Sequence, residues 1–354
     1  MKTITFTNIV KKVFFSALIL PSSYFFAQEN EEKKKFSFDG SVDAYYRYNF
    51  NGPNKNEEGA VLAPPTSFAN DPGFALGFVN LIGSYEGEKV GFTADLVFGP
   101  RGEDAVFLSE GSSNIVNQLY VYWNLNDKLK LTFGNFNTFL GYEVISPTDN
   151  FNYSTSYMFS FGPFSHTGLK ADILLSEKWS LMLGILNATD FTEFNPAEQY
   201  SLGTQLSYTT EKGAAYLNFI YGKQGPVDTD DATFQADLTA GVDLNEDVYL
   251  GINTTYNTTD GDGFYGIALY PQYKTSESFS LGLRAEYFNT FFEDNNVEDE
   301  NVIAFTLTGS YTVEDLTIKP ELRLDSASSD IFTDPDLVAS NNLASFLIAA
   351  IYSF

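Results

Sequence analysis

The sequence of 354 residues contains no cysteine and a single histidine, His166. Disulfides are therefore excluded, and a zinc site built from Cys and His would have too few ligands. Lys and Arg number only 20 against 46 Asp and Glu. Nucleic-acid binding needs clustered basic residues, so this balance argues against nucleic acid as a partner. No glycine-rich phosphate loop or nucleotide motif is visible, and we expect no cofactor and no metal.

The sequence also lacks a hydrophobic run long enough for a membrane-spanning helix, which needs about 20 residues. A short apolar run at 13–20 follows three lysines and precedes small residues that end at Ala27. This layout is typical of a secretory signal peptide over 1–27, with an N-terminal membrane anchor as the alternative. Cleavage after Ala27 would remove three basic and no acidic residues, which lowers the formal charge from −26 to −29.

Aromatic residues are abundant, at 16 % of the chain, and they alternate with polar residues. In 36–50 one parity is almost entirely apolar and the other is polar. Because successive side chains of a strand point to opposite faces, one set would face lipid and the other a lumen. Only a closed barrel could carry such strands across a membrane, since lipid offers no partners to free backbone groups. The same pattern recurs at 234–244 and 315–325, where Pro320 predicts a local irregularity.

Short turns and longer connections alternate along the chain. The turns fall at 86–89, 125–128, 176–178, 211–213, 245–247, 276–278 and 313–315. The longer connections fall near 51–72, 100–114, 139–162, 189–198, 223–232, 259–263, 291–300 and 325–341. Seven turns and eight loops join sixteen strands, although one misread hairpin would give fourteen or eighteen.

We therefore predict an all-β fold, a transmembrane antiparallel up-and-down β-barrel over 36–354 with short periplasmic turns and long extracellular loops. Residues 28–35 would form a charged periplasmic leader. The alternative is a soluble β-sandwich, but its strands would be about five or six residues long, and the alternating stretches here are longer.

Aromatic residues flank the short turns, among them Trp123 and Trp179, as expected for the interfacial girdle of a barrel. The chain ends in an alternating stretch that closes with Phe354. A terminal strand of this kind is similar to the sorting signal that outer-membrane barrels present to their assembly machinery. We expect that machinery, outer-membrane lipid and lipopolysaccharide as partners, and a homo-oligomer is compatible with the pattern. The predicted location is the bacterial outer membrane.

Residues 134–168 carry a more specific pattern. Gly134, the Gly-Tyr-Glu at 141–143, Asn150, the Gly-Pro-Phe at 162–164 and the His-Thr-Gly at 166–168 resemble the OmpL-like family of β-barrel porins. The resemblance extends loosely over the mature chain. It implies a passive outer-membrane pore and supplies no catalytic or ligand-binding residue.

Loop 139–162 is the candidate constriction, because it is long, aromatic and in places nearly apolar. It could instead cover the barrel rim or a neighbouring subunit. Alternation and loop position select a set of charged residues that we predict to line or constrict the pore: Arg47, Glu143, Asp149, Lys170, Arg284, Glu286, Lys319, Glu321 and Arg323.

The basic members of this set fall mostly on one arc of a sixteen-strand circle, and the loop approaches from the opposite side. One hypothesis is a lateral field between this arc and the acidic loop residues, which would sort solutes by charge. The alternative is that each arginine pairs with an inward neighbour, Glu286 or Glu321.

The predicted function is a porin-type channel for passive diffusion of small hydrophilic solutes. The alternative is a plugged structural or ligand-binding barrel with acidic surface loops. Acidic runs at 228–231, 260–262 and 293–300 could suggest calcium, but none has the full spacing of a known calcium loop. Ser165 and His166 are adjacent and would point to opposite faces of a strand, so we predict no enzyme.

Overall fold

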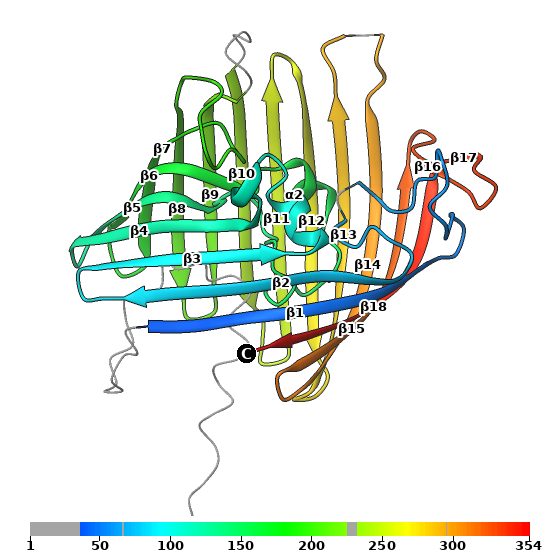
Figure 1. Ribbon diagram of the computed structural model, residues 1–354, viewed down its shortest axis with the longest axis horizontal. Coiled ribbons are helices and arrows are strands. Elements are labelled where there is room, and N and C mark those ends of the chain that lie inside the picture. The colour runs from blue at the N-terminus through cyan, green and yellow to red at the C-terminus, as the bar shows by residue number, and fades with distance from the viewer. Residues whose placement is uncertain (1–35, 66, 225–231, 295) are drawn as a thin grey trace, which may run out of the picture.

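The computed structural model describes residues 36–354 except 66, 225–231 and 295. Its sheet closes into an antiparallel barrel of sixteen strands (Figure 1). Each barrel strand pairs with its neighbours in the chain, and β18 closes the ring against β1. The predicted all-β up-and-down barrel and its strand count are confirmed. The predicted signal peptide at 1–27 and leader at 28–35 lie outside the described residues.

The barrel strands are eight to fourteen residues long. Their bounds are β1 (Phe36–Asn49), β2 (Gly73–Glu86), β3 (Val90–Phe98), β4 (Val116–Asn126), β5 (Leu129–Asn137), β6 (Ser165–Leu174), β7 (Trp179–Leu186), β8 (Ser201–Thr210), β9 (Gly213–Lys223), β10 (Ala232–Asp243), β11 (Val248–Thr259), β12 (Asp262–Lys274), β13 (Phe279–Phe291), β14 (Glu300–Val313), β15 (Leu316–Ala327) and β18 (Asn342–Ser353).

The connections contain small elements that the alternation pattern does not predict. They are α1 (Pro100–Ala105), η2 (Gly111–Ile115), α2 (Tyr157–Phe161) and the two-stranded sheet of β16 (Phe332–Thr333) and β17 (Ala339–Ser340). Within the described part of the chain, no helix has the length and hydropathy needed to cross a membrane.

Alternation along β14 shows how the wall is built. The outward residues Ile303, Phe305 and Leu307 are each close to half exposed, whereas Thr306 and Thr308 on the inward face are fully buried. An apolar outer face with a polar inner face is the arrangement of a barrel that contacts lipid outside and a polar lumen inside.

The irregularity predicted at Pro320 is present. The pairing between β14 and β15 is interrupted between Glu321 and Ile318, on either side of this residue. Proline has no backbone N–H to donate to the ladder, which explains the gap. Pro271 interrupts the pairing of β12 with β13 in the same way.

Short turns join the strands at one end of the barrel, and the longer connections lie at the other end. One connection differs from the prediction. The expected loop at 259–263 is a tight turn through Asp260 and Gly261, both with positive φ, at 49° and 88°. Two successive residues of this conformation are typical of a two-residue hairpin turn.

The short-turn end carries the predicted aromatic residues. Trp179 and Tyr208 occupy opposite positions of β7 and β8, with ring centroids 4.7 Å apart. Phe354 lies near this end, where its backbone N–H and C=O bond Gly40 at 3.0 Å each. The last residue therefore helps to close the barrel, and its ring remains exposed on the outer face.

Candidate constriction site

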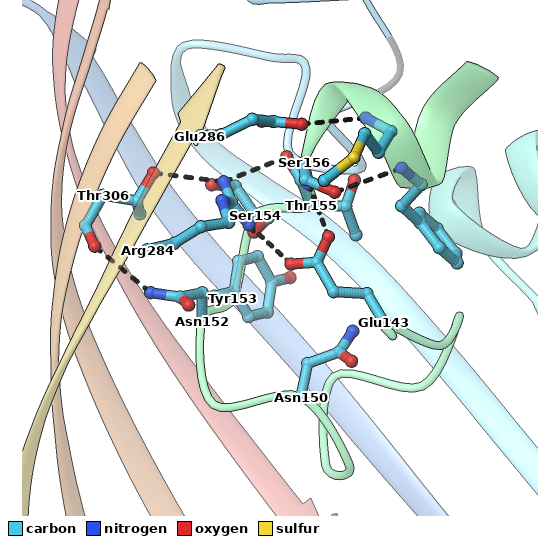
Figure 2. A network of polar contacts seen from close by, with 12 residues as sticks. Glu143, Asn150, Asn152, Tyr153, Ser154, Thr155, Ser156, Arg284, Glu286 and Thr306 are labelled. Atoms are coloured by element: carbon cyan, nitrogen blue, oxygen red, sulfur yellow. Dashed lines mark hydrogen bonds and ion pairs between the residues drawn. The ribbon is translucent and has the colours of Figure 1, made fainter. Parts of the chain in front are cut away.

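The connection between β5 and β6 folds into the barrel. All side chains from Asn152 to Phe159 are buried, and this stretch includes the first half of α2. Figure 2 shows the segment among side chains of β13 and β14. The predicted position of loop 139–162 inside the barrel is therefore confirmed. Its apolar residues also pack there, since Tyr157 and Met158 join a buried cluster with Phe264 and Phe288.

Carboxylates of the barrel wall accept the N–H groups of this loop. Glu286 of β13 accepts from the backbone of Tyr157 and Met158 at 3.0 and 2.9 Å. Glu321 of β15 accepts from the backbone of Tyr153 at 2.9 Å. The loop backbone is outside the sheet, so its polar groups need other partners when buried. The two glutamates supply those partners.

Basic side chains of the wall donate to the carbonyl groups of the same loop. Arg284 donates to the backbone oxygens of Ser154 and Thr155 at 2.6 and 3.1 Å. Arg323 donates to that of Thr155 at 2.7 Å. Lys319 donates to two further loop carbonyls at 2.8 and 2.5 Å. Wall carboxylates thus bind N–H groups of the loop backbone, and wall cations bind its carbonyl groups.

Glu143 joins the loop to the wall directly. Its carboxylate lies 2.6 Å from the Arg284 guanidinium, and both side chains are buried. It also accepts from the backbone N–H of Ser156 at 2.7 Å. The lateral field expected between Arg284 and Glu143 is therefore wrong, because no open lumen separates them. The alternative pairing is also wrong, since Arg284 pairs with Glu143 and Arg323 with Asp325, at 2.9 Å.

The buried charged groups around the loop nearly balance, with five basic and six acidic side chains. A network with little excess charge adds little to the field in the remaining lumen. The basic members are Arg47, Arg101, Arg284, Lys319 and Arg323, and the acidic members are Asp43, Glu143, Asp237, Glu286, Glu321 and Asp325.

The start of the loop is fixed on another wall by Asp237 of β10. This carboxylate accepts from the backbone N–H of Gly141 at 3.0 Å. It also accepts from the side chains of Asn218, Asn253 and Thr255. The loop therefore has anchors on both sides of the lumen.

Other connections at the long-loop end of the barrel also bind this loop. Arg101 of α1 donates to the backbone oxygens of Ile145 and Tyr153 at 2.7 and 3.1 Å. The Tyr153 hydroxyl donates to Asp43 of β1. Gly77 of β2 leaves the space for this bond, because a Cβ there would collide with both side chains.

The structure brings most of the predicted site residues into this one network. Arg47, Asp149 and Lys170 are the exceptions. Arg47 is buried, but it donates to Asn49 and to the backbone oxygen of Ala69. Asp149 is exposed at the loop tip, and Lys170 is half-exposed on β6, 3.6 Å from Asp172. The buried residues are Arg47, Glu143, Arg284, Glu286, Lys319, Glu321 and Arg323.

The sequence pattern did not predict that Arg101, Tyr153 and Asp325 belong to the network. Arg101 and Tyr153 lie in connections, where alternation assigns no face. The polar run at 152–156 was the available signal, because a loop that enters a lumen with small polar residues exposes many backbone groups that need charged partners.

A polar-lined, lipid-facing barrel with a loop folded into its lumen defines the class of outer-membrane porins. The chain matches the model of the family described as "Putative beta-barrel porin-2, OmpL-like" over residues 35–354 and belongs to that family. It is accordingly a porin-type channel of the bacterial outer membrane. No curated protein matches the sequence.

Solved structures share the fold at low sequence identity. The outer membrane channel DcaP of Acinetobacter baumannii aligns with a TM-score of 0.63 and 12 % identity, covering 90 % of this chain and 97 % of that one. OmpF of Salmonella typhi gives 0.61 and 10 %, with the same coverage. An anion-selective porin from Comamonas acidovorans gives 0.60 and 11 %, covering 90 % and 99 %.

Replacing Arg284 with Met should destabilise the barrel by about 3–5 kcal/mol, because Glu143 and two loop carbonyls lose a buried cationic partner. The matched control is Lys170→Met, which removes the partly exposed ion pair with Asp172. It should lower the free energy of unfolding by about 0–1 kcal/mol. Denaturant unfolding of the refolded protein in lipid vesicles measures both. Equal losses for the two variants would contradict the anchoring role of Arg284.

The C-terminal root of the loop should make stability depend on pH. Asp190, in the connection between β7 and β8, accepts the backbone N–H groups of Phe164 and Ser165 at 2.7 and 2.8 Å. Burial raises the pKa of Asp190 from 3.8 to about 7, and these two bonds only partly oppose it. The folded protein therefore keeps a proton that the unfolded chain has released, so stability falls as pH rises from about 4 to 7.

Asp190→Asn keeps the accepting oxygen and removes the charge. We expect its Tm to vary less than that of the wild type between pH 4 and 8, and to exceed it at pH 8 by roughly 2–4 °C. Thermal unfolding in detergent across this range measures the difference. Parallel curves for the two proteins would show that Asp190 does not titrate there.

Proposed function

We propose that small hydrophilic solutes diffuse passively through this barrel, past a constriction formed by loop 139–162. The observation that carries the proposal is a set of inward side chains on β3–β8, toward the short turns, that the loop leaves partly exposed. A sixteen-strand barrel is wide enough for an aqueous channel. The loop covers the inward residues of β13–β15, while inward residues such as Tyr120 and Lys170 remain half-exposed. A plugged barrel, the second candidate, would bury these side chains as well.

We further propose that the protein has no enzymatic activity. Nε2 of His166 lies 2.9 Å from the Thr138 hydroxyl, and Nδ1 has no hydrogen-bond partner among the described residues. A nucleophile–base pair needs an orienting group on the second ring nitrogen. The contact to Thr138 instead ties the start of the loop to β6.

The two ends of the chain carry the candidate signals for export and for assembly. We propose that 1–27 directs secretion, and that the strand ending at Phe354 is presented to the barrel-assembly machinery. The exposed ring of Phe354 on the outer face supports that role. Outer-membrane lipid and lipopolysaccharide are the proposed surroundings of the outer face. A homo-oligomer remains a prediction.

Single-channel recording of the refolded protein in planar bilayers tests the proposed function. We expect discrete conductance steps. A variant recorded beside the wild type replaces Ser146–Asp149, the tip of the loop, with Gly-Gly. The base of this tip should stay closed, because Val144 and Asn150 form mutual hydrogen bonds there at 2.9 and 2.5 Å. Shortening the tip should enlarge the conductance steps, because the tip of the wild-type loop narrows the lumen.

Silence of the wild-type protein, with recovery of conductance only when the tip is shortened, would favour the plugged barrel. Equal steps for both proteins would show that the narrowest point lies elsewhere.

A further inference from the structure

Two lysines at a similar height in the barrel have opposite environments. Lys319 lies three residues from the short-turn end of β15, and Lys170 lies four residues from the short-turn end of β6. Lys319 is only 4 % exposed, because it donates to the carbonyls of Pro147 and Asn150 in the loop tip. Lys170 is half-exposed. The loop tip therefore covers the β15 wall and leaves the β6 wall accessible.

These two walls face each other. In the ring of sixteen strands, β6 and β15 are separated by seven strand steps in one direction and nine in the other. Toward the short turns, space for solutes then remains beside Lys170. Inward side chains of neighbouring strands agree, since they are half-exposed at Thr93, Gln118, Tyr120, Tyr122, Lys130, Asp172 and Gln205.

The β6 side also carries the accessible positive charge of the lumen. Lys130 and Asp172 are opposite residues of β5 and β6, and Lys170 lies 3.6 Å from the same carboxylate. Two lysines thus lie beside Asp172, and Glu86 at the end of β2 is a second acidic group that acts on Lys130. Lys274 is also half-exposed, but it ends β12 and pairs at 3.0 Å with Glu277 in the adjoining turn.

Aromatic rings hold both lysines against the wall. Lys130 Nζ lies 4.4 Å from the centroid of the Tyr122 ring, and Lys170 Nζ lies 5.1 Å from that of Phe136. Cation–π contacts of this kind restrain a flexible ammonium group without neutralising it. A pocket next to Lys130 is lined by Gln205 and Ser207, whose side-chain hydrogen bonds go to each other, to Asn218 and to the loop carbonyl of Phe139. The fixed positive charge of the two lysines suits a carboxylate or another small anion.

We propose that Lys130 and Lys170, near the short-turn ends of β5 and β6, form a subsite for the anionic group of a permeating solute. The inference rests on the proposed channel function. The subsite differs from the predicted arc of Arg284, Lys319 and Arg323, whose charges are bound to the loop. The exposed Asp149 at the loop tip supplies a negative charge on the side of Lys319. The field across the remaining lumen is then opposite in direction to the predicted one.

Reversal potentials in planar bilayers test the subsite, measured in gradients of KCl and of potassium acetate. The double variant Lys130→Ala/Lys170→Ala should raise the ratio of cation to anion permeability by about threefold or more in both salts. Lys130→Arg/Lys170→Arg keeps the charge and should retain the wild-type ratio. The matched control is Lys178→Ala/Lys212→Ala, which removes two exposed lysines from short turns and should leave the ratio unchanged.

Channels with an unaltered ratio in the Lys130/Lys170 alanine variant would overturn the subsite and leave the channel function intact. An equal shift in the turn control would also overturn it, because the effect would then come from the charge at the barrel mouth. Absence of wild-type channels would instead contradict the proposed function. A shift in acetate alone would narrow the subsite to carboxylates, and a shift in both salts supports small anions in general.

Discussion

The peptide groups of the lumenal loop must all find partners inside the barrel, and the rest of the site depends on this constraint. The strands satisfy their own backbone by pairing, but the loop at 152–158 does not. Wall carboxylates bind its N–H groups, and wall guanidinium and ammonium groups bind its carbonyls. Charge-assisted hydrogen bonds are about twice as strong as neutral ones. Such bonds hold an irregular segment in one conformation across a wide lumen.

Burying so many charges is costly unless every charge is paired and hydrogen-bonded. The cluster offsets much of this cost by binding the loop from several strands. Four of its buried polar atoms have no hydrogen-bond partner among the described residues, namely Asp43 Oδ2, Arg47 Nη2, Arg101 Nη2 and Arg284 Nε. As a consequence for transport, the charged side chains of the buried cluster are removed from the solute path. On the proposed subsite, the charged groups that solutes meet include Lys130, Lys170 and Asp172 on the wall and Asp149 on the loop.

Most of the fold follows from the sequence because strand alternation is a local property. The outward and inward sets of β1 and β14, the short turns and the closing residue Phe354 can all be read from residue order. The tight turn at Asp260 and Gly261 could also have been recognised from its residues. The lumenal position of the loop follows from its apolar side chains, which need a buried environment.

The partners within the site could not be predicted, because alternation gives the face of a residue and not its distance from a loop. Arg284 and Lys170 have the same inward orientation, yet one is buried under the loop and the other is half-exposed. The difference depends on where the loop lands after crossing the barrel. That position is set by Glu143, Tyr153 and Arg101, which lie outside the strands and carry no periodic signal.

A disulfide between the loop and the wall tests most directly whether the loop occupies this position while the channel conducts. Asn152 Nδ2 lies 2.7 Å from Thr308 Oγ1, and the chain has no other cysteine to interfere. For Asn152→Cys/Thr308→Cys, we expect the disulfide to form and oxidation to leave the single-channel conductance unchanged. A conductance that collapses on oxidation and returns on reduction would show that the loop must leave the wall for solutes to pass, and would contradict the account.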